Sequence, residues 1–430
     1  MINKKFVLWS TFLILLITLS LSTHNFDSQN KVKSPTAVNV TGAAAVVTKQ
    51  EKELFKMRKN AINIAIANYF KKAIDQQLIV GAGVSVVSGD SILFNGGFGM
   101  RSFSKLDSVN AQTVFRLGSL SKGFTGVLAG IEVAEGNLSW DDKLATALPQ
   151  FHLKNKLNEQ AITLSNVLSH TTGVPYHCYT NLVEAGLAMS QIAEKFKVIN
   201  TISKPGDLYS YQNAMFALSG EMMQAATGQS IQQLLQNKIF SPLNMKTAST
   251  DYDAMINTDN YAFPHKNTAK GWMQIPVNKK YYNAVPAGGI NASAEDMAKW
   301  MHFLLGHEES VLTKSGLQSV FTPQIEMLDG RKYYQRWKGH LKSSYAYGWR
   351  IHDFINAETG VETSMIHHGG SVSNFRNEIA LYPSEDFGVC VLFNSMTPLA
   401  TSVIPDLHDI VQNIMNMPAS EFGLSELVSL

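Results

Sequence analysis

Residues 115–124 read FRLGSLSKGF, and within this stretch Ser119 stands three residues before Lys122 at the start of an apolar run. On a helix, positions i and i+3 lie on the same face, so the serine hydroxyl and the lysine amine come within reach of each other. A basic amine beside a serine can activate it as a nucleophile. The N-terminal amides and dipole of the same helix favour negative charge near the serine. The stretch therefore predicts a helix that begins near Ser119 and carries a nucleophile with its base.

The Ser-x-x-Lys spacing occurs twice more in the chain, so the spacing alone does not select the pair. The other two hits begin at Ser28, in a polar linker, and at Ser102, between a strand and a loop. Neither of them precedes an apolar helical run. The surrounding sequence therefore selects Ser119 and Lys122 as the candidate catalytic pair.

A second motif lies in PGDLYSYQNAMFALSG, which starts at Pro205 and places Tyr211 two residues before Asn213. Two side chains at this spacing on a loop can point the same way. We expect a neighbouring lysine to lower the pKa of a buried phenol, which could then share proton transfer. An asparagine amide can bond both the lysine and a substrate amide. The alternative reading is a turn that only caps the helix after it.

A third motif, IHHGGSVSNF, starts at Ile366 and places His368, Gly369 and Gly370 at the end of a predicted strand. Glycines at this position let a ligand approach the backbone closely. The histidine could bind a substrate carboxylate or hydrogen-bond the tyrosine of the second motif. His367 is interpreted as a structural histidine with its own partners, and the same reading stays open for His368.

The order of the three motifs resembles that of the class C β-lactamase-like serine hydrolases, which include D-alanyl-D-alanine carboxypeptidases, class C β-lactamases and related esterases. Other segments that look like parts of this family are VLSHTTGVP from Val167, PAGGINASAEDMAKWM from Pro286 and YGWR from Tyr347. The resemblance covers about residues 81–394. It rests on several segments in one order, which is more specific than any single motif.

The resemblance implies a catalytic role for three residues. Ser119 would be the acylated nucleophile, Lys122 its proton acceptor and Tyr211 the acid/base partner. Backbone amides would hold the oxyanion, one from Ser119 and one from the strand after His368. Such a reaction needs no metal and no organic cofactor.

The resemblance also implies a substrate-binding role for Asn213, His368, Gly369 and Gly370. His368 stands where the class C enzymes proper have a lysine. A few residues later the family commonly has Pro-Gly-Phe or Gly-Gly-Phe, whereas this chain has Ser-Asn-Phe with Asn374 in the middle. A side chain at Asn374 either narrows the site or strains the turn. This departure concerns the substrate class more than catalysis.

These residues lead to one preferred function and two alternatives. We expect an exported serine hydrolase of the D-alanyl-D-alanine carboxypeptidase or esterase type, which forms an acyl-enzyme on amide, lactam or ester bonds. Its substrate would be a small molecule or a fragment derived from peptidoglycan. A class C-type β-lactamase is the second reading. It ranks below the first because a histidine in the third motif disfavours efficient lactam hydrolysis. A non-catalytic penicillin-recognising binding or sensor protein is the third.

The N-terminal part of the hydrolase region shows a helix and a hairpin. Residues 49–74 repeat apolar side chains at helical spacing, with an interruption at Asn68. Two β-rich runs follow, at residues 84–87 and 91–94, and they meet at Gly89-Asp90, which is typical of a hairpin turn.

The order of elements along the chain predicts the fold class. A helix-rich region follows from about residue 119 to residue 305, and strand patterns then return until about residue 394. We therefore expect an α+β fold, in which an antiparallel sheet is built from N- and C-terminal strands, is flanked by helices and carries an inserted helix-rich region.

The N-terminus has the order of an export signal. Two lysines precede an uncharged apolar segment over residues 6–22. We expect residues 1–22 to be a signal peptide, or a membrane anchor if they are not cleaved. Residues 23–47 would be a linker, residues 48–415 the hydrolase domain and residues 416–430 a C-terminal tail. The expected location is periplasmic or extracellular.

Composition excludes several other classes. Of 430 residues, 45% are hydrophobic, and the net charge is only +2, so no overall charge favours nucleic acid. Two cysteines, Cys178 and Cys390, exclude a disulfide framework but leave a single bridge open. No Cys/His metal-ligand spacing is present. The stretch GRKYYQRWKGH from Gly330 is interpreted as a solvated loop, and a rim near the site, together with residues 264–276, is the alternative.

Overall fold

The computed structural model of the protein describes residues 49–424 except residues 329 and 331. These residues all belong to the unit Lys49–Leu430. The predicted signal segment and linker lie outside the described residues, as do the last six residues of the predicted tail. Within the described part of the chain, no helix combines the length and the apolar character that a membrane span requires.

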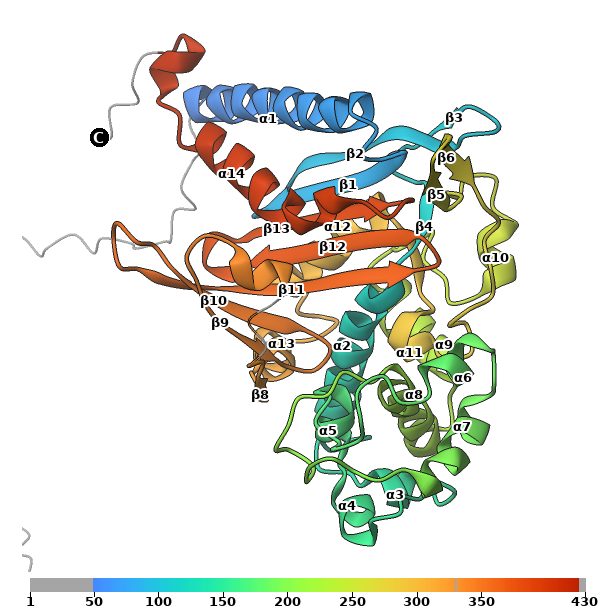
Figure 1. Ribbon diagram of the computed structural model, residues 1–430. Helices are drawn as coiled ribbons and strands as arrows, with labels where there is room; N and C mark the ends of the chain where they lie inside the picture. Colours follow the sequence, from blue (N-terminus) through green and yellow to red (C-terminus); the bar gives the residue numbers. More distant parts are fainter. Residues whose placement is uncertain (1–48, 329, 331, 425–430) are drawn as a thin grey trace, which may run out of the picture. The chain divides into compact units, whose positions relative to one another are not determined.

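An antiparallel sheet built from N-terminal and C-terminal strands forms the centre of the fold. Its nine strands pair in the order β3-β2-β1-β13-β12-β11-β10-β9-β8. In this order the strands are Asp107–Ser108, Ser91–Ser102, Gly81–Ser88, Phe387–Phe393, Phe375–Tyr382, Glu362–Val372, Arg350–Ile355, His340–Tyr345 and Ile325–Glu326. Strand β1, from the N-terminal part, pairs with β13 from the C-terminal part, with Val86 opposite Val389. The predicted α+β fold with a sheet built from both ends is confirmed (Figure 1).

Helices cover both faces of this sheet (Figure 1). Helices α1 (Lys49–Asp75) and α14 (Val403–Met415) pack on one face, and α2 (Ser121–Ala134) and α12 (Ala294–His302) lie on the other. Alternate residues of β13 therefore enter different cores: Val389 joins the core with α1 and α14, and Cys390 joins the core with α2 and α12. Burial on both faces explains why every residue of β13 is buried.

The helix-rich region between β4 and β8 supplies part of the wall of the cavity beside Ser119. Its helices are α3 (Leu144–Ala147), α4 (Lys156–Ala161), α5 (Leu164–Leu168), α6 (Thr180–Glu184), α7 (Met189–Lys195), α8 (Asn213–Thr227), α9 (Ile231–Leu235), α10 (Tyr252–Ile256), α11 (Val285–Gly288) and α13 (Lys314–Phe321). Two small antiparallel sheets accompany them, β4 (Val114–Arg116) with β7 (Asn291–Ser293) and β5 (His265–Thr268) with β6 (Gly271–Gln274).

The hairpin of β1 and β2 turns at Gly89-Asp90 as predicted, because Ser88 pairs with Ser91. Both strands run farther than the pattern indicated. The glycine-rich part of β2 has weak strand propensity, yet Gly97 pairs opposite Gly83. A Cβ atom at Gly97 would lie 2.5 Å from the backbone of Val109. Close approach of a neighbouring chain segment, rather than local propensity, thus explains this strand.

Helix α2 packs directly against the YGWR segment. A Cβ atom at Gly126 would lie 1.9 Å from the carbonyl oxygen of Tyr347. Gly348 has a φ of +82°, and a Cβ atom there would lie 2.2 Å from the carbonyl oxygen of Lys122. Glycine is therefore required on both sides of this contact. The contact holds the first turn of α2, and with it Lys122, against the sheet.

The two cysteines do not form a bridge. Cys390 is a buried free thiol in β13, which is the core position that its apolar surroundings indicated. Cys178 is a partly buried free thiol in the helix-rich region. The single disulfide that the sequence left open is therefore absent between these two described residues.

Candidate active site

The predicted nucleophile and base lie together. Ser119 belongs to a short 3-10 turn, Gly118–Leu120, and α2 begins only at Ser121, so the helix starts two residues later than expected. The Nζ atom of Lys122 lies 3.4 Å from the Oγ atom of Ser119. The hydroxyl of Tyr211 donates a hydrogen bond of 2.9 Å to the same Oγ atom. One serine oxygen thus faces both an amine and a phenol.

Lys122 is fully buried, and its amine has two other acceptors. Nζ donates to Oδ1 of Asn213 and to the carbonyl oxygen of Ala287, each at 2.8 Å. Burial lowers the pKa of Lys122 well below its ordinary value, and the positive charge of Arg350 lowers it further. A neutral amine has two N–H donors, which these two acceptors use. Its lone pair is then left for the proton of Ser119.

Tyr211 differs from expectation in its protonation. We predicted that a neighbouring lysine lowers the pKa of this phenol, and that prediction is wrong. Burial raises the pKa of Tyr211, and the opposing effects of Arg350 and of the Ser119 hydrogen bond do not outweigh it. Tyr211 is thus a neutral phenol that donates to Ser119, and Lys122 is the better base.

Asn213 holds the lysine rather than standing free in the cavity. It is the first residue of α8, its Oδ1 accepts from Lys122, and its Nδ2 donates to the hydroxyl of Tyr281 at 3.0 Å. It still lines the cavity next to Ser119. The sequence contained no signal for Tyr281, which lies 68 residues away from its partner in the chain.

His170, in the VLSHTTGVP segment, supports Tyr211. Its ring centroid lies 4.3 Å from that of Tyr211, and its Nδ1 accepts a bond of 3.2 Å from the backbone N–H of Gln212. Its φ is +60°, which is uncommon for a residue with a side chain. We identified the segment by resemblance but assigned no function to this histidine.

His368 does not lie open to a ligand. It is fully buried, its Nε2 lies 3.0 Å from the hydroxyl of Tyr345, and its Nδ1 lies 2.8 Å from the carbonyl oxygen of Gly369. Burial lowers the pKa of His368 well below its ordinary value, with further lowering by the charge of Arg350. Both ring nitrogens thus have protein partners, which fits the structural reading that the sequence left open. The tyrosine that it bonds is Tyr345 and not Tyr211.

The two glycines after His368 are required by packing of the protein on itself. A Cβ atom at Gly369 would lie 2.8 Å from a carboxylate oxygen of Glu378 and 2.9 Å from the hydroxyl of Tyr333. A Cβ atom at Gly370 would lie 2.3 Å from the carbonyl oxygen of Leu117. Gly369 lines the cavity, and Gly370 brings β11 against the turn that carries Ser119.

A buried carboxylate lies behind Gly369. Glu378 accepts bonds from the hydroxyl of Tyr333, at 2.8 and 2.9 Å, and is paired with Arg376 and with Nε2 of His367. Burial raises the pKa of Glu378 to about 7, although Arg376 opposes this shift. His367 also contacts His352 through Nδ1, at 3.1 Å. His367 therefore has partners on both nitrogens, as we expected of a structural histidine.

The turn at Asn374 is strained rather than intrusive. Ser373 and Asn374 both have positive φ, +47° and +69°, in the left-handed region that glycine adopts readily. Asn374 is not among the residues that line the cavity. Of the two consequences that the sequence left open, strain of the turn is therefore the one observed.

A cavity of about 800 Å³ opens beside Ser119. Its wall is rich in tyrosine, and the tyrosines that line it are Tyr176, Tyr209, Tyr211, Tyr281, Tyr333 and Tyr334. Lys332 also lines it, so the stretch from Gly330 is not simply a solvated loop, and the rim alternative is correct for residues 332–334. The hairpin of β5 and β6 is not among the lining residues.

The pH dependence of acylation should report the pKa of Lys122. Only the neutral amine can accept the serine proton, so kcat/KM falls as the pH decreases through that pKa. Because burial lowers the pKa, the rate should reach its plateau well below pH ~10.4, the ordinary pKa of lysine. The measurement is kcat/KM for a p-nitrophenyl ester from about pH 5 to about pH 10.

The matched control for this profile is Tyr211→Phe. We expect a lower rate at every pH but the same midpoint, because burial raises the pKa of the phenol and keeps it neutral throughout. A midpoint near 10.4, or a midpoint that vanishes in Tyr211→Phe, would contradict the assignment of Lys122 as the base.

Comparison with known proteins found relatives in sequence and in structure. A family model described as Beta-lactamase matches residues 66–411. The unguisins hydrolase ungD' of Aspergillus campestris is 25% identical over 340 residues, which covers 76% of this chain and 61% of that protein. Protein flp of Staphylococcus aureus is 24% identical over 343 residues, with coverages of 78% and 64%. The chain thus spans less than two thirds of the length of these curated relatives.

A solved structure shares the fold. The octameric penicillin-binding protein homologue from Pyrococcus abyssi matches with a TM-score of 0.68 at 21% identity. The match covers 80% of this chain and 77% of that one.

Proposed function

Because the chain belongs to the beta-lactamase family, whose model matches residues 66–411, we propose that it is an exported serine hydrolase that forms an acyl-enzyme at Ser119. The proposed substrates are amides or esters of the D-alanyl-D-alanine carboxypeptidase or esterase type. The observation that carries the proposal is the position of Ser119 Oγ, which lies 3.4 Å from Nζ of Lys122 and 2.9 Å from the hydroxyl of Tyr211.

In the proposed acylation, Ser119 transfers its proton to the neutral amine of Lys122 while Oγ attacks the carbonyl carbon. The negative charge that develops on the carbonyl oxygen is held by backbone amides of Ser119 and Ser371. The close approach of the Gly118 turn to the backbone of Ser371 supports this arrangement. Tyr211 gives its hydroxyl proton to the leaving group and regains a proton from the protonated amine of Lys122. Water then releases the acyl group by the reverse path, which restores neutral Lys122 and the hydroxyl of Ser119.

The charge near the nucleophile supports a substrate with a carboxylate. Arg350 lines the cavity, and its positive charge contributes to the lowered pKa of Lys122 and His368 and opposes the rise in the pKa of Tyr211 that burial causes. A peptide that ends in D-alanine carries such a carboxylate next to its scissile bond. The cavity of about 800 Å³ leaves room for a peptide on the other side. For export we rely on the apolar segment of residues 6–22, which could also associate with a membrane.

The test is intact-mass spectrometry of the purified protein mixed separately with a penicillin, a chromogenic cephalosporin and a short-chain p-nitrophenyl ester, with product absorbance followed in parallel. We expect ester turnover and a penicillin adduct that persists, with cephalosporin turnover at least about 100-fold slower than ester turnover. Fast lactam turnover would instead make the protein a β-lactamase. If the protein shows no turnover and forms no adduct, the result would favour a non-catalytic relative.

A further inference from the structure

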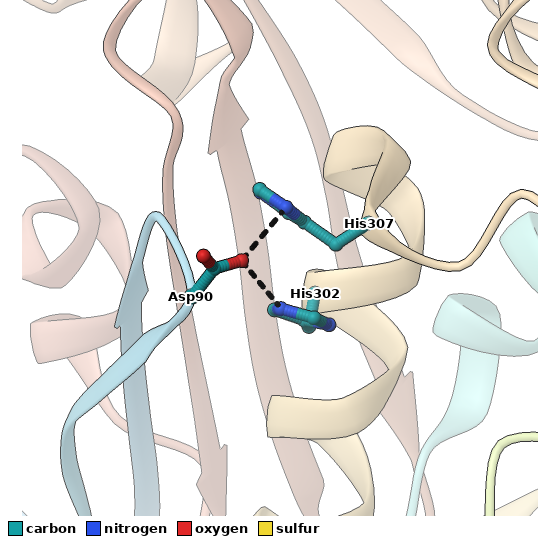
Figure 2. Close-up of side chains that lie close together, drawn as sticks. All are labelled: Asp90, His302 and His307. Carbon is teal, nitrogen blue, oxygen red and sulfur yellow. Dashed lines mark ion pairs between the residues drawn. The ribbon is translucent and has the colours of Figure 1, made fainter. Parts of the chain in front are cut away.

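A second cluster of chemically active side chains lies away from the cavity, where three distant segments meet. Asp90 stands in the turn between β1 and β2, His302 ends α12, His307 ends the turn after α12, and Asp386 precedes β13. Figure 2 shows one carboxylate oxygen of Asp90 facing both imidazoles from the side. The backbone ties two of these turns together, because the N–H of Gly89 donates to the carbonyl oxygen of Asp386 at 2.9 Å.

The ligand atoms of this cluster are spaced as a metal site requires. The Oδ1 atom of Asp90 lies 3.3 Å from Nδ1 of His307 and 3.8 Å from Nε2 of His302. All three atoms lie within 4.8 Å of one another. Tetrahedral ligands with bonds of about 2.0–2.2 Å to zinc lie about 3.3–3.6 Å apart. Small side-chain rotations would therefore bring the three atoms to bonding distance of one ion.

The fourth residue orients one of the ligands. The Nε2 atom of His307 lies 2.8 Å from Oδ1 of Asp386. A histidine that binds a metal through one nitrogen usually donates the other N–H to a carboxylate in this way. If Nε2 carries that proton, the lone pair of Nδ1 faces the anionic oxygen of Asp90, and a cation between them removes the repulsion. The contact between Asp90 and His302, at 3.8 Å, is too long for a hydrogen bond and leaves room for the ion.

The backbone is built so that the two histidines share one face. In an α-helix, residues five apart point about 140° away from each other. Here α12 passes into a π-helical turn, Phe303–His307, in which the hydrogen bonds span five residues. The imidazole rings consequently stack, with centroids 4.5 Å apart and planes 19° apart. Gly306, with a φ of +90°, kinks the backbone inside this turn and lets His307 face Asp90.

We infer that Asp90, His302 and His307 bind a Zn²⁺ ion, with Asp386 orienting His307 and a water in the remaining position. Two imidazoles and one carboxylate are ligands that zinc accepts. The ion clamps the β1–β2 turn to the end of α12 and to the turn before β13. It serves stability rather than acyl transfer, since strand β12 separates the cluster from the Ser119 turn by on the order of 25 Å.

The experiment is isothermal titration of ZnCl₂ into the full chain, free of any affinity tag and previously stripped with EDTA. The wild type should bind one ion per chain. Zinc affinity should fall at least tenfold in His302→Gln and in His307→Gln, and about 10- to 100-fold in Asp386→Asn. Zinc should also raise the Tm of the wild type and leave that of the double histidine variant unchanged.

The control is His408→Gln. His408 is about as exposed as His302 and His307, at 19% against 27% and 21%, and it also pairs with a carboxylate, Glu385, at 2.7 Å. The His408→Gln variant should bind zinc with the same affinity as the wild type. Asp90→Ala changes a side chain that is 91% exposed, so it tests the site without a risk to folding, and it should weaken binding at least tenfold.

Three results would overturn the assignment. The first is that the wild type fails to bind zinc stoichiometrically. The second is unchanged zinc affinity in the double histidine variant or in Asp90→Ala, and the third is a loss of zinc affinity in His408→Gln equal to that in the site variants. Zinc binding and ester turnover are measured separately, so failure of one does not affect the other.

Discussion

The Ser119→Ala variant is expected to form no covalent adduct with a penicillin or an ester, and to lose at least about 10³-fold in kcat/KM. Ser119 Oγ is the atom that contacts both the amine of Lys122 and the hydroxyl of Tyr211. Its removal takes away the bond-forming atom while the buried base keeps its bonds to Asn213 and Ala287. The measurements are intact-mass spectrometry for the adduct and initial rates for turnover.

The chain offers a matched control in a second Ser-x-x-Lys pair. Ser102 precedes Lys105 by three residues, as Ser119 precedes Lys122, but its hydroxyl bonds Gln274 at 3.1 Å and it does not line the cavity. The Ser102→Ala variant should therefore form the covalent adduct and turn over the ester as the wild type does. An adduct that persists in Ser119→Ala would show that another residue is acylated and would refute the proposed mechanism.

The Lys122→Met variant should lose about 10²- to 10⁴-fold in the rate of acylation, the usual range for removal of a positioned base. Methionine has about the length of the lysine stem, and it can fill the space between the rings of Tyr211 and Phe216, which lie 4.8 and 5.4 Å from Nζ. The hydroxyl of Ser119 stays in place but loses its proton acceptor. The measurement is the rate at which the adduct mass appears after mixing.

This variant must also be shown to fold, because the substitution leaves the acceptors on Asn213 and Ala287 without a donor. Each unsatisfied buried acceptor costs about 1–3 kcal/mol, and removal of the desolvation penalty of the amine offsets part of that cost. Circular dichroism and Tm test this directly. Lys105→Met is the matched control and should acylate normally. Acylation at the wild-type rate in a folded Lys122→Met protein would assign the base to another group.

The features that the sequence predicted correctly depend on local geometry or on strand pattern. The distance between Ser119 and Lys122 follows from one helical turn, and the turn at Gly89-Asp90 follows from its two residues. The sheet built from both chain ends followed from where strand patterns stop and resume. The resemblance to the family placed Tyr211 and Asn213 correctly beside the pair.

The features that the sequence did not predict depend on what surrounds a side chain. His368 had the right position in the motif, but only packing shows that Tyr345 and Gly369 occupy both of its nitrogens. The pKa of Tyr211 moved opposite to expectation because burial outweighs nearby positive charge. Burial depends on the whole fold, and no local pattern encodes it.

The sequence by itself thus determined the family, the α+β fold and which serine, lysine, tyrosine and asparagine lie together in the candidate site, because these follow from motifs in a fixed order and from short-range periodicity. Only the tertiary structure brought Tyr281 to Asn213, Tyr333 to Glu378 and Asp90 to His302 and His307. The residues in these contacts lie between 45 and 217 positions apart in the chain. Contacts over such separations are set by how the helices and the sheet pack together, which the spacing of residues along the chain does not reveal.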